Sequence, residues 1–559
     1  MPTDLMAHSK QERKQLGAFY TPKEIAEALV DWALREPSDL VLDPSFGGHV
    51  FLDAARAKLR NLGTSEPGLG QVFGTDVDQL AHERSDAAKP YAHLVKRDFF
   101  ELGPGSEIPL VSAVVGNPPY VRYQDWNRDQ SQAFQVAKQA GVNFSRLASI
   151  WAPFVVHATS FLKRGGRLAF VLPAELLHAQ YAKPVIPFLQ REFQAIGIAM
   201  FRESIFPGAQ EEVVLLLADN KGADKARAIQ IVEFEDATKL DLGRLFAPRR
   251  GETTSGEPLL ELLPRAARRL YRRLQKSSMT DCLGTLASVD IGAVTGGNEY
   301  FLMNPADAPV PEELLRPAIS KAAHLRGARF GSEDLEELTA AGARSYLLVA
   351  DEHTSPSLLR RARKYLDAGE VEGIADRYKC RVRNPWWAVP VPGHGAPQLY
   401  LTYCASAYPR IAANDAGALH TNTVHGVTMV NGLSPQALAA GFYNSITLLS
   451  AELVGRSYGG GVLKLEPTEA EALLLPRIDN SAAELLPQVD RLIRARADLD
   501  QVLDMTDDVL LRSGIGLSDA EIRSLRRSGE RLRQRRLQRG RSRKVPKRRA
   551  HPRKHPIKL

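Results

Sequence analysis

The chain has 559 residues, a formal net charge of +8 and 44% hydrophobic residues, enough for two or three domains with sizeable apolar cores. It contains no run of 18 apolar residues, and its first residues lack the layout of a secretory signal, so we expect no membrane association and a cytoplasmic location. The three cysteines, Cys282, Cys380 and Cys404, are far apart and form no C-x-x-C pair, which argues against a disulfide framework or a metal site.

The first 245 residues predict an α/β domain. A helix over 22–34 is followed by a short apolar strand, 40–42, which ends at Asp43. The next residues, Pro44-Ser45-Phe46-Gly47-Gly48, form a turn in which two glycines let the backbone approach a ligand, and a helix over 51–62 comes next. Strand, glycine turn and helix hold nucleotide-like ligands. The sequence has neither the G-x-G-x-x-G spacing nor a G-K-[ST] loop, which favours a ligand without phosphates.

Two further strands each end in an acid. The strand 72–74 runs into Thr75-Asp76, the place where an acidic side chain grips a ribose diol. The strand 94–97 runs into Asp98-Phe99, and an acid beside an aromatic ring suits the amino group and ring of an adenine. A surface carboxylate after a strand is common, but a series of such strand ends in order is rarely accidental.

The apolar run 111–116 predicts a buried parallel strand, and it ends abruptly in Asn117-Pro118-Pro119-Tyr120. The prolines stiffen the backbone beyond the strand's carboxyl end, where open α/β sheets place their chemistry. The Asn117 amide oxygen and a backbone carbonyl beside the prolines can accept hydrogen bonds from an exocyclic amine, and Tyr120 offers a flat face for stacking. These four residues predict a site for a planar amine such as adenine N6, with a plain strand-terminating turn as the alternative.

Taken in order, these motifs resemble the amino (gamma) group of adenine-N6 DNA methyltransferases, of the TaqI-like or Eco57I-like type found in bacterial restriction–modification systems. The resemblance rests on Gly17-Ala18-Phe19-Tyr20-Thr21-Pro22, Asp43-Pro44-x-Phe46-Gly47-Gly48, Asp76, Asp98-Phe99 and Asn117-Pro118-Pro119-Tyr120. It implies an α/β fold: a Rossmann-like, S-adenosylmethionine-dependent methyltransferase sheet with helices on both faces, followed by a separate α+β target-recognition domain. The composition beyond that domain predicts a disordered basic C-terminal tail.

The resemblance also implies roles for individual residues. Tyr20, Thr21 and Pro22 would close over the methionine part of S-adenosylmethionine, beside a cofactor loop formed by Asp43, Pro44, Phe46, Gly47 and Gly48. Asp76 would bind the ribose hydroxyls, and Asp98 and Phe99 the cofactor adenine. Asn117 and the Pro118 carbonyl, on the turn stiffened by Pro119, would accept hydrogen bonds from the target amine, while Tyr120 and Phe206 contact the extruded base. The cofactor loop departs from the family pattern at His49, which replaces a glycine.

The remaining residues divide into further segments. We expect the catalytic domain at 1–245, a linker and basic helix at 246–285, the target-recognition domain at 286–480 and a helical region at 481–522. The basic helix places Arg265, Arg268, Arg269, Arg272, Arg273 and Lys276 on one cationic face, either a solvated surface or a track for a DNA backbone. Loops of the recognition domain, such as 457–464, supply polar groups for bases and phosphates, and Trp386 and Trp387 are candidates for base stacking or, equally, for the core.

The segment 523–559 is a basic tail. It holds 17 Lys and Arg against the single acid Glu530, a net +16, which leaves −8 for the rest of a chain whose total is +8. The stretch 539–549 has no apolar period, and we expect the tail to be disordered when free. It could hold DNA phosphates without reading sequence, or it could serve only as a solubilising terminus.

We interpret the chain as a site-specific DNA methyltransferase that acts on adenine N6 in double-stranded DNA after base flipping, and that is bacterial, monomeric and associated with the nucleoid through DNA. We find no nuclease motif, so a cognate endonuclease would be encoded separately. A cytosine-C5 enzyme would need a Pro-Cys pair, which the sequence lacks. Two alternatives stay open: a methyltransferase for RNA or for a protein glutamine, and a methyltransferase-like DNA specificity module without catalysis.

Overall fold

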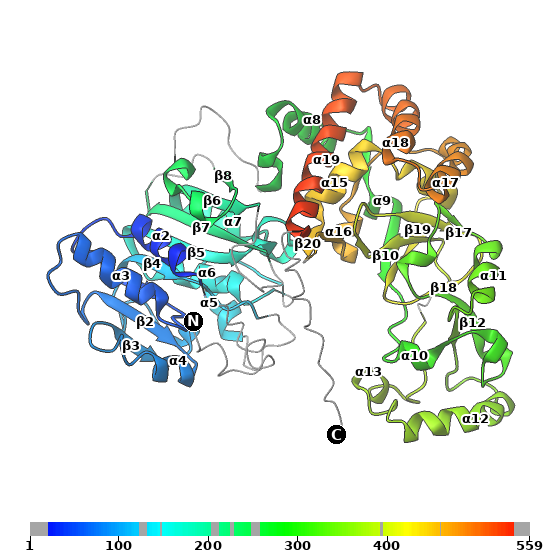
Figure 1. The fold of residues 1–559 in the computed structure, drawn as a ribbon, viewed down its shortest axis with the longest axis horizontal. Coiled ribbons are helices and arrows are strands. Elements are labelled where there is room, and N and C mark those ends of the chain that lie inside the picture. Colours follow the sequence, from blue (N-terminus) through cyan, green and yellow to red (C-terminus); the bar gives the residue numbers. More distant parts are fainter. Residues whose placement is uncertain are drawn as a thin grey trace, which may run out of the picture.

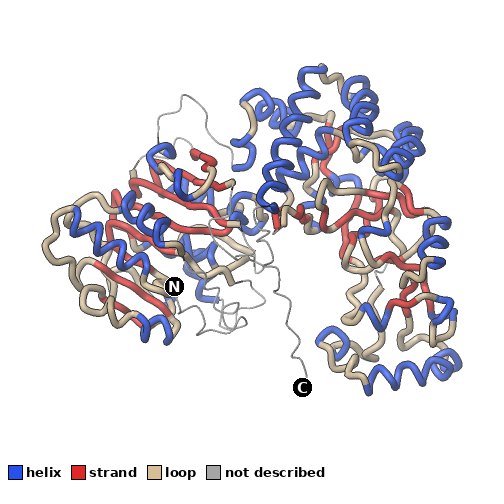
Figure 2. Tube along the Cα trace, in the orientation of Figure 1, coloured by secondary structure: helices blue, strands red, loops and turns tan. Residues whose placement is uncertain are grey.

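A computed structural model of the chain describes residues 21–121, 131–145, 148–202, 212–223, 229–246, 258–391, 395–458 and 460–541. The described residues form two arms that meet along one side (Figure 1). We call residues 21–246 the N-terminal arm and residues 258–541 the second arm. Figure 2 shows a large sheet in the N-terminal arm. In the second arm, helices lie above smaller sheets, and the helices beside the N-terminal arm form what we call the joint.

The core of the N-terminal arm is a sheet with the strand order β3-β2-β1-β4-β5-β7-β6-β8. The strands are β1 (Val41–Asp43), β2 (Val72–Asp76), β3 (His93–Lys96), β4 (Val111–Gly116), β5 (Leu162–Pro173), β6 (Phe193–Phe201), β7 (Val213–Lys221) and β8 (Ile229–Phe234). Neighbours from β3 to β5 are parallel, and β7 is antiparallel to both β5 and β6. All of β4 is buried, as an apolar strand covered on both faces should be. The chain leaves β1 for β2 on one side and later returns to β4 on the other, which makes β1 and β4 the topological switch point.

Helices pack on this sheet in two groups. They are α2 (Lys23–Ala33), α3 (Val50–Asn61), α4 (Gln79–Arg84), α5 (Ser131–Gln139), α6 (Trp151–Ser160) and α7 (Val185–Glu192). Helix α2 contacts α3, β4 and β5, while α6 contacts α5, α7 and β5. The helices expected over 22–34 and 51–62 are confirmed within a residue or two. Helix α6 ends at Ser160, because the chain enters β5 at Leu162, and the glycines at 165 and 166 lie within that strand.

The second arm combines small sheets with helices, as the expected α+β class requires. Its sheets have the orders β10-β19-β15-β17-β13, β11-β14-β12-β18, β16-β21-β20 and β22-β9. The strands are β9 (Thr280–Cys282), β10 (Ala287–Ile291), β11 (Leu302–Met303), β12 (Leu315–Ile319), β13 (Arg329–Phe330), β14 (Tyr346–Leu348), β15 (Leu399–Thr402), β16 (Cys404–Ala405), β17 (Ile411–Asn414), β18 (Leu419–His420), β19 (Val424–Met429), β20 (Arg456–Tyr458), β21 (Val462–Lys464) and β22 (Leu474–Pro476).

The helices of the second arm border these sheets and form the joint between the arms. They are α8 (Arg265–Gln275), α9 (Leu283–Leu286), α10 (Asn298–Phe301), α11 (Ser332–Ala340), α12 (Pro356–Val371), α13 (Tyr378–Arg381), α14 (Pro435–Gly441), α15 (Ser445–Val454), α16 (Pro467–Glu471), α17 (Leu486–Arg494), α18 (Leu499–Asp507) and α19 (Asp519–Arg541). In Figure 1, α8, α15 and α19 lie at the joint. Within the described ranges no single helix is long and apolar enough to cross a membrane, and α14 and α15 reach that composition only as a pair bent by 82°.

The expectation of a disordered tail from Arg523 onward is wrong for its first half. Residues up to Arg541 belong to α19, which packs along α15 and buries Leu525 and Leu532. Gly529 faces α15, where an added Cβ would lie at an ordinary contact distance of 3.5 Å from the Cα of Leu449. A sparse apolar stripe at helical spacing was enough to order the helix once α15 was there to cover it. Residues 542–559 lie outside the described residues.

Several arginines of α19 are bound by carboxylates within the protein, whereas Arg523, Arg527 and Arg531 are exposed. Arg536 pairs with Glu452 at 2.6 Å and is almost fully buried. Arg526 binds Asp507 at 2.9 Å. Arg535 crosses to the N-terminal arm and binds Glu233. These pairs explain why a sequence with so much positive charge folds as a packed helix, since buried charges require partners.

The single cationic face expected on α8 is also only partly correct. Arg268 and Arg272 both bind Glu261, the latter at 3.1 Å, and Arg273 binds Glu521 of α19 at 2.6 Å. Carboxylates distant in the sequence therefore neutralise part of this face. Of the linker expected at the start of 246–285, residues 247–257 lie outside the described residues.

Trp386 belongs to a packed aromatic cluster, which favours the core interpretation over base stacking. Its ring lies 5.7 Å from that of Tyr300 and 6.2 Å from that of Phe301, and its indole nitrogen donates to Glu370 at 3.1 Å. The neighbouring Trp387 lies edge-on to Trp386 at 5.7 Å. Both rings pack against the apolar cluster around α10, β11 and α12.

Candidate active site

The carboxyl ends of β1, β2 and β4 meet at the switch point of the sheet, and the turns that follow them are tied together. The Ser45 hydroxyl donates to the Asn117 carbonyl at 3.2 Å, and the Phe46 amide donates to the Thr75 carbonyl at 3.4 Å. An open parallel sheet binds ligands at this edge, because the strand ends diverge there. The motifs that the sequence places 40 to 120 residues into the chain are therefore neighbours in space.

The glycine turn after β1 has the backbone conformation that its sequence predicts. Gly47 and His49 both have positive φ, 47° and 54°. The Gly47 amide donates to the Asp76 Oδ2 at 2.9 Å, which joins the turn to the end of β2. Beneath it Phe46 is buried against Gly74, where an added Cβ would lie 3.0 Å from the Phe46 ring. The turn is thus a close-fitting backbone cradle, in which the non-glycine His49 adopts the left-handed conformation that a glycine favours.

Asp76 stands at the end of β2 beside this cradle. Its carboxylate accepts from the backbone amides of Gly47 and Asp78, at 2.9 and 2.8 Å. Burial raises the pKa of Asp76, and these hydrogen bonds oppose that shift. A carboxylate oxygen has more than one lone pair, so a hydroxyl donor of a ligand could be accepted in addition to the backbone amides.

Asp43 is the most deeply buried acid of the site, with 1% of its surface exposed. Its Oδ1 accepts from the Ser45 amide at 3.1 Å, whereas its Oδ2 is buried and has no hydrogen-bond partner among the described residues. An added Cβ at Gly116 would lie 2.7 Å from Asp43 Oδ1, so only glycine fits at the end of β4. Burial raises the pKa of Asp43 from 3.8 to about 8, helped by the nearby Asp76.

This pKa predicts a pH-dependent stability difference between the wild type and Asp43→Asn. A carboxyl group whose pKa is higher in the folded state stabilises the fold below pH 4, and this contribution is lost as the pH rises toward 8. The amide of asparagine does not titrate, so the Tm of Asp43→Asn relative to wild type should be higher at pH 8.5 than at pH 5. Calorimetry of the ligand-free proteins at both pH values tests this. An equal Tm difference at the two pH values would show that Asp43 is ionised throughout.

Asp98 and Phe99, two and three residues beyond the end of β3, have different surroundings. Asp98 begins the short 3-10 helix η1 (Phe99–Glu101), where its Oδ1 accepts from the Phe100 amide at 3.0 Å. The Phe99 side chain packs into the core, with ring centroids 4.7 Å from Phe154 and 4.6 Å from His157. Asp98 thus lies just beyond the carboxyl end of β3, whereas the Phe99 ring is part of the core. A contact of either residue with a cofactor adenine stays a prediction.

Asn117-Pro118-Pro119-Tyr120 directly follows β4, beside the cradle. Asn117 and Pro119 are half-buried, whereas Pro118 and Tyr120 are buried, with Tyr120 8% exposed. The chain beyond is fixed at Val121, whose carbonyl accepts from the Ile150 amide at 3.2 Å and from the Ser149 hydroxyl at 3.0 Å. The turn is therefore held at both ends, by Ser45 at Asn117 and by the start of α6 at Val121.

Other sequence-predicted residues lie at the margin of this region or outside it. Thr21 is buried, and the Pro22 carbonyl accepts the first amides of α2 at 3.1 Å. Tyr20 and Phe206 lie outside the described residues. Sequence reasoning did not identify Ser45 or Gly116 as site residues, although both stand inside the motifs it used; their roles depend on a cross-strand hydrogen bond and a close approach that only the folded chain creates.

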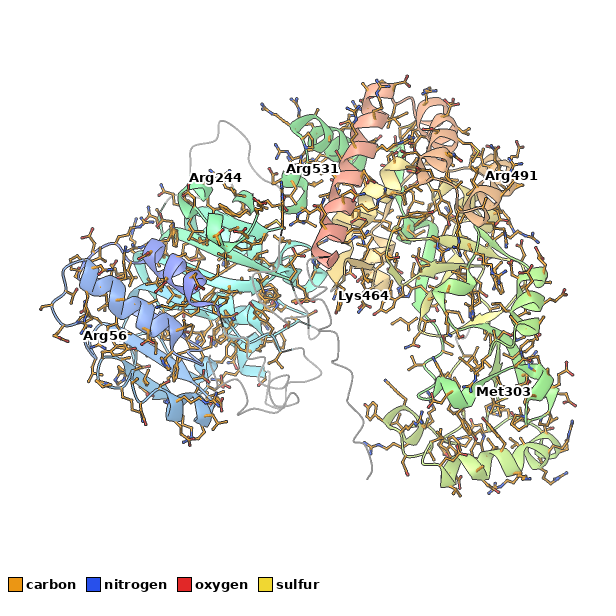
Figure 3. All side chains as sticks on the ribbon, viewed as in Figure 1. Arg56, Arg244, Met303, Lys464, Arg491 and Arg531 are labelled. Carbon is orange, nitrogen blue, oxygen red and sulfur yellow. The ribbon has the colours of Figure 1, made fainter. Side chains whose placement is uncertain are left out.

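The loop 457–464, expected to supply DNA contacts, lies at the joint of the two arms. Figure 3 shows Lys464 at the lower end of this joint. The Lys464 ammonium binds Glu466 at 2.6 Å and lies over the rings of Tyr403 and Tyr458, at 4.8 and 5.0 Å. These contacts raise the pKa of Lys464 against the effect of burial. Its charge is therefore largely held within the protein.

The fold and the strand-end motifs define a class, the Rossmann-like methyltransferases, here carrying Asn-Pro-Pro-Tyr after the fourth strand. Residues 4–241 match the N-6 DNA Methylase family, and residues 258–511 match the C-terminal domain of Type II methyltransferase M.Eco57I. Together the two matches span most of the chain and support an N6 DNA methyltransferase of restriction–modification systems, with a C-terminal domain of the M.Eco57I type.

Known relatives match most of the chain at low sequence identity. Type II methyltransferase M.AccI of Acinetobacter calcoaceticus is 23% identical over 90% of this chain and 94% of its own length. Type II methyltransferase M.XamI of Xanthomonas campestris pv. amaranthicola is 27% identical over 83% and 86%. Among solved structures, the Type IIL restriction-modification enzyme MmeI in complex with DNA has a TM-score of 0.59 and 13% identity, over 94% of this chain and 80% of that one. This last likeness is one of fold.

Proposed function

We propose that this protein transfers a methyl group from S-adenosylmethionine to the N6 amine of adenine in double-stranded DNA, as the modification enzyme of a restriction–modification system. The observation that carries the proposal is the position of Asn117-Pro118-Pro119-Tyr120. This turn follows β4 at the switch point and is tied through Ser45 to the cradle that Asp43 and Asp76 line. A cognate endonuclease would be a separate chain, and the enzyme would act as a monomer.

The residues present suit the cofactor. The glycine cradle, the Asp43 Oδ2 that lacks a hydrogen-bond partner among the described residues, and the Asp76 carboxylate lie together at this edge of the sheet, and the sequence has no phosphate loop, which fits a phosphate-free nucleoside. S-adenosylmethionine supplies an activated methyl group on a positively charged sulfur. In the proposed arrangement Asp76 accepts from the ribose hydroxyls, Asp98 and Phe99 flank the adenine, and Thr21 and Pro22 with Tyr20 cover the methionine part.

The catalytic turn acts on the target amine. An adenine N6 that donates to the Asn117 side-chain oxygen and the Pro118 carbonyl is favoured in a tetrahedral form over its flat, conjugated form. These hydrogen bonds are stronger in the transition state than in the ground state, so they accelerate the reaction instead of merely binding the base. The target base must first leave the duplex, at a cost of a few kcal/mol. Tyr120 and Phe206 would offset part of this cost by stacking.

The reaction is tested by measuring methyl incorporation into duplex DNA, RNA and protein side by side with labelled S-adenosylmethionine. We expect incorporation into duplex DNA alone, with N6-methyladenine at one sequence as the product. Incorporation into RNA or a protein glutamine would replace the proposed substrate. Cofactor binding without turnover on any duplex would favour a non-catalytic specificity module.

The corrected boundary of the C-terminal helix changes which truncation tests the basic tail. Deleting 523–559 would remove the buried side chains of α19 and unfold the joint, whereas deleting 542–559 removes eight Lys and Arg and no acid. We expect the shorter deletion to weaken DNA binding mainly at low salt and to reduce its salt dependence, with the methylated sequence unchanged. Binding titrations at several salt concentrations measure this. Unaltered affinity and salt slope would identify the tail as a solubilising terminus.

A further inference from the structure

Arg456, the first residue of β20, connects the two arms at their joint. Its guanidinium donates two hydrogen bonds to Glu469 of α16, at 3.0 and 2.7 Å, and Glu469 is fully buried. The same guanidinium lies 3.9 Å from Glu175 of the N-terminal arm. Glu469 also accepts from the Glu466 amide at 2.8 Å. Arg456 is thus bound tightly to Glu469 in the second arm and also makes a longer ion pair with Glu175 in the N-terminal arm.

Glu175 begins a chain of hydrogen bonds inside the N-terminal arm. It stands in the 3-10 helix η2 (Ala174–Leu177), just beyond the carboxyl end of β5, and accepts from the Tyr181 hydroxyl. The Tyr181 oxygen in turn accepts from the Trp151 indole nitrogen at 3.0 Å. Burial and the neighbouring Glu175 raise the pKa of Tyr181 well above its usual value, so the phenol stays protonated and keeps donating to Glu175.

Trp151 carries this chain to the catalytic turn. It is fully buried and is the first residue of α6. The two residues before it, Ser149 and Ile150, donate to the Val121 carbonyl at 3.0 and 3.2 Å, and Val121 directly follows Tyr120. An unbroken series of ion pair, hydrogen bonds and backbone bonds therefore connects Arg456 to the end of Asn117-Pro118-Pro119-Tyr120.

We propose that Arg456 is a positioning residue: through Glu175, Tyr181 and Trp151 it lets the second arm set the place of the catalytic turn. The inference rests on the proposed function, because it assumes that the turn acts on a base delivered by DNA bound to the second arm. Glu469 holds the guanidinium in the second arm through two hydrogen bonds. The Arg456–Glu175 contact is then the part of the chain that depends on how the arms are arranged.

The least disruptive test is Tyr181→Phe, which removes one hydroxyl and leaves the ring, with Arg456→Gln as its partner variant. We expect each to lower kcat on saturating cognate duplex about 3- to 10-fold, the scale of coupling changes reported along such networks, while S-adenosylmethionine affinity changes less than twofold. The double variant should be no slower than the slower single one, because both break the same chain.

Arg526→Gln is the matched control. Arg526 also pairs with a buried carboxylate, Asp507, and with a more exposed one, Asp504, but both belong to α18, so these two ion pairs stay within the second arm. It should lower Tm as Arg456→Gln does and leave kcat unchanged. An equal loss of kcat in Arg526→Gln would overturn the proposal, as would additive losses or wild-type kcat in Tyr181→Phe.

Amide hydrogen exchange gives a readout that does not need activity. Both test variants should speed exchange around residues 149–152 and at Val121, and Arg526→Gln should not. If the wild type methylates no duplex, the proposed function is wrong, but the exchange rates of the variants still show whether Arg456 and Tyr181 are coupled to the catalytic turn. If the wild type is active and exchange in Tyr181→Phe equals that of the wild type, only the coupling fails.

Discussion

Asn117→Ala is expected to abolish methyl transfer to duplex DNA while cofactor and DNA binding stay close to those of the wild type. The side-chain oxygen is proposed to act on the target amine alone, and its bond strengthens as the nitrogen becomes tetrahedral. Its loss should therefore lower kcat much more than it raises KM. Asn117 also contributes its carbonyl to the Ser45 hydrogen bond, which alanine retains. Single-turnover kinetics with labelled cofactor, together with calorimetry of cofactor binding, measure the separation.

Two further variants sharpen this expectation. Asn480→Ala, whose side-chain oxygen accepts from the Ser434 amide in the second arm, makes the same chemical change far from the site and should be fully active. Tyr120→Ala should loosen the extruded base by about 1–3 kcal/mol of stacking, with a smaller defect on a mismatched adenine that is easier to extrude. Substantial N6-methyladenine formation by Asn117→Ala would refute this turn as the active site.

Asp76→Ala is expected to weaken binding of S-adenosylmethionine by about 2–3 kcal/mol, or about 30- to 150-fold, the range for a hydrogen bond to a charged group that is lost from a buried site. The side chain has two roles: it accepts from the Gly47 amide and is proposed to accept from the ribose hydroxyls. The Asp76→Ala substitution removes both interactions, so it loosens the glycine turn and also removes the proposed contact with the ribose. Titration calorimetry of the purified protein with the cofactor gives the change directly.

Asp78→Ala separates local damage from loss of the ribose contact. Asp78 follows in the same turn and caps α4 by accepting from the Leu80 amide at 3.1 Å, but the expected ribose contact does not involve it. We expect its substitution to lower Tm, since a lost cap costs about 1 kcal/mol, and to leave cofactor affinity nearly unchanged. Equal affinities of Asp76→Ala and wild type would mean that the end of β2 does not bind the cofactor.

The sequence predicted the N-terminal arm well because its signals are local. A short, continuous apolar run such as 111–116 predicts a strand that is buried on both faces, and prolines and glycines mark where that strand ends. The order of strands with an acid or an amide at each end then identifies the carboxyl edge of a parallel sheet. The roles of single residues there still depend on ligand contacts that the measurements above would establish.

Prediction failed where a segment's environment is made by distant residues. Residues 523–541 carry few apolar side chains, so composition alone indicated a solvated tail. Leu525 and Leu532 nevertheless match the surface of α15, and Arg526, Arg535 and Arg536 meet carboxylates from other segments. A charge count cannot show which arginines have partners, because the carboxylates of Glu233 and Glu452 lie far away in the sequence.

The sequence by itself determined the α/β class of the N-terminal arm, the positions of its strand ends and the chemistry offered at each, because backbone periodicity and turn residues act over a few positions. The tertiary structure decided how the arms are joined and which charges are free. Arg456, Arg535 and α19 cross between segments that no local pattern links. Burial and ion pairing depend on those long-range contacts, and so does the path from the second arm to the catalytic turn.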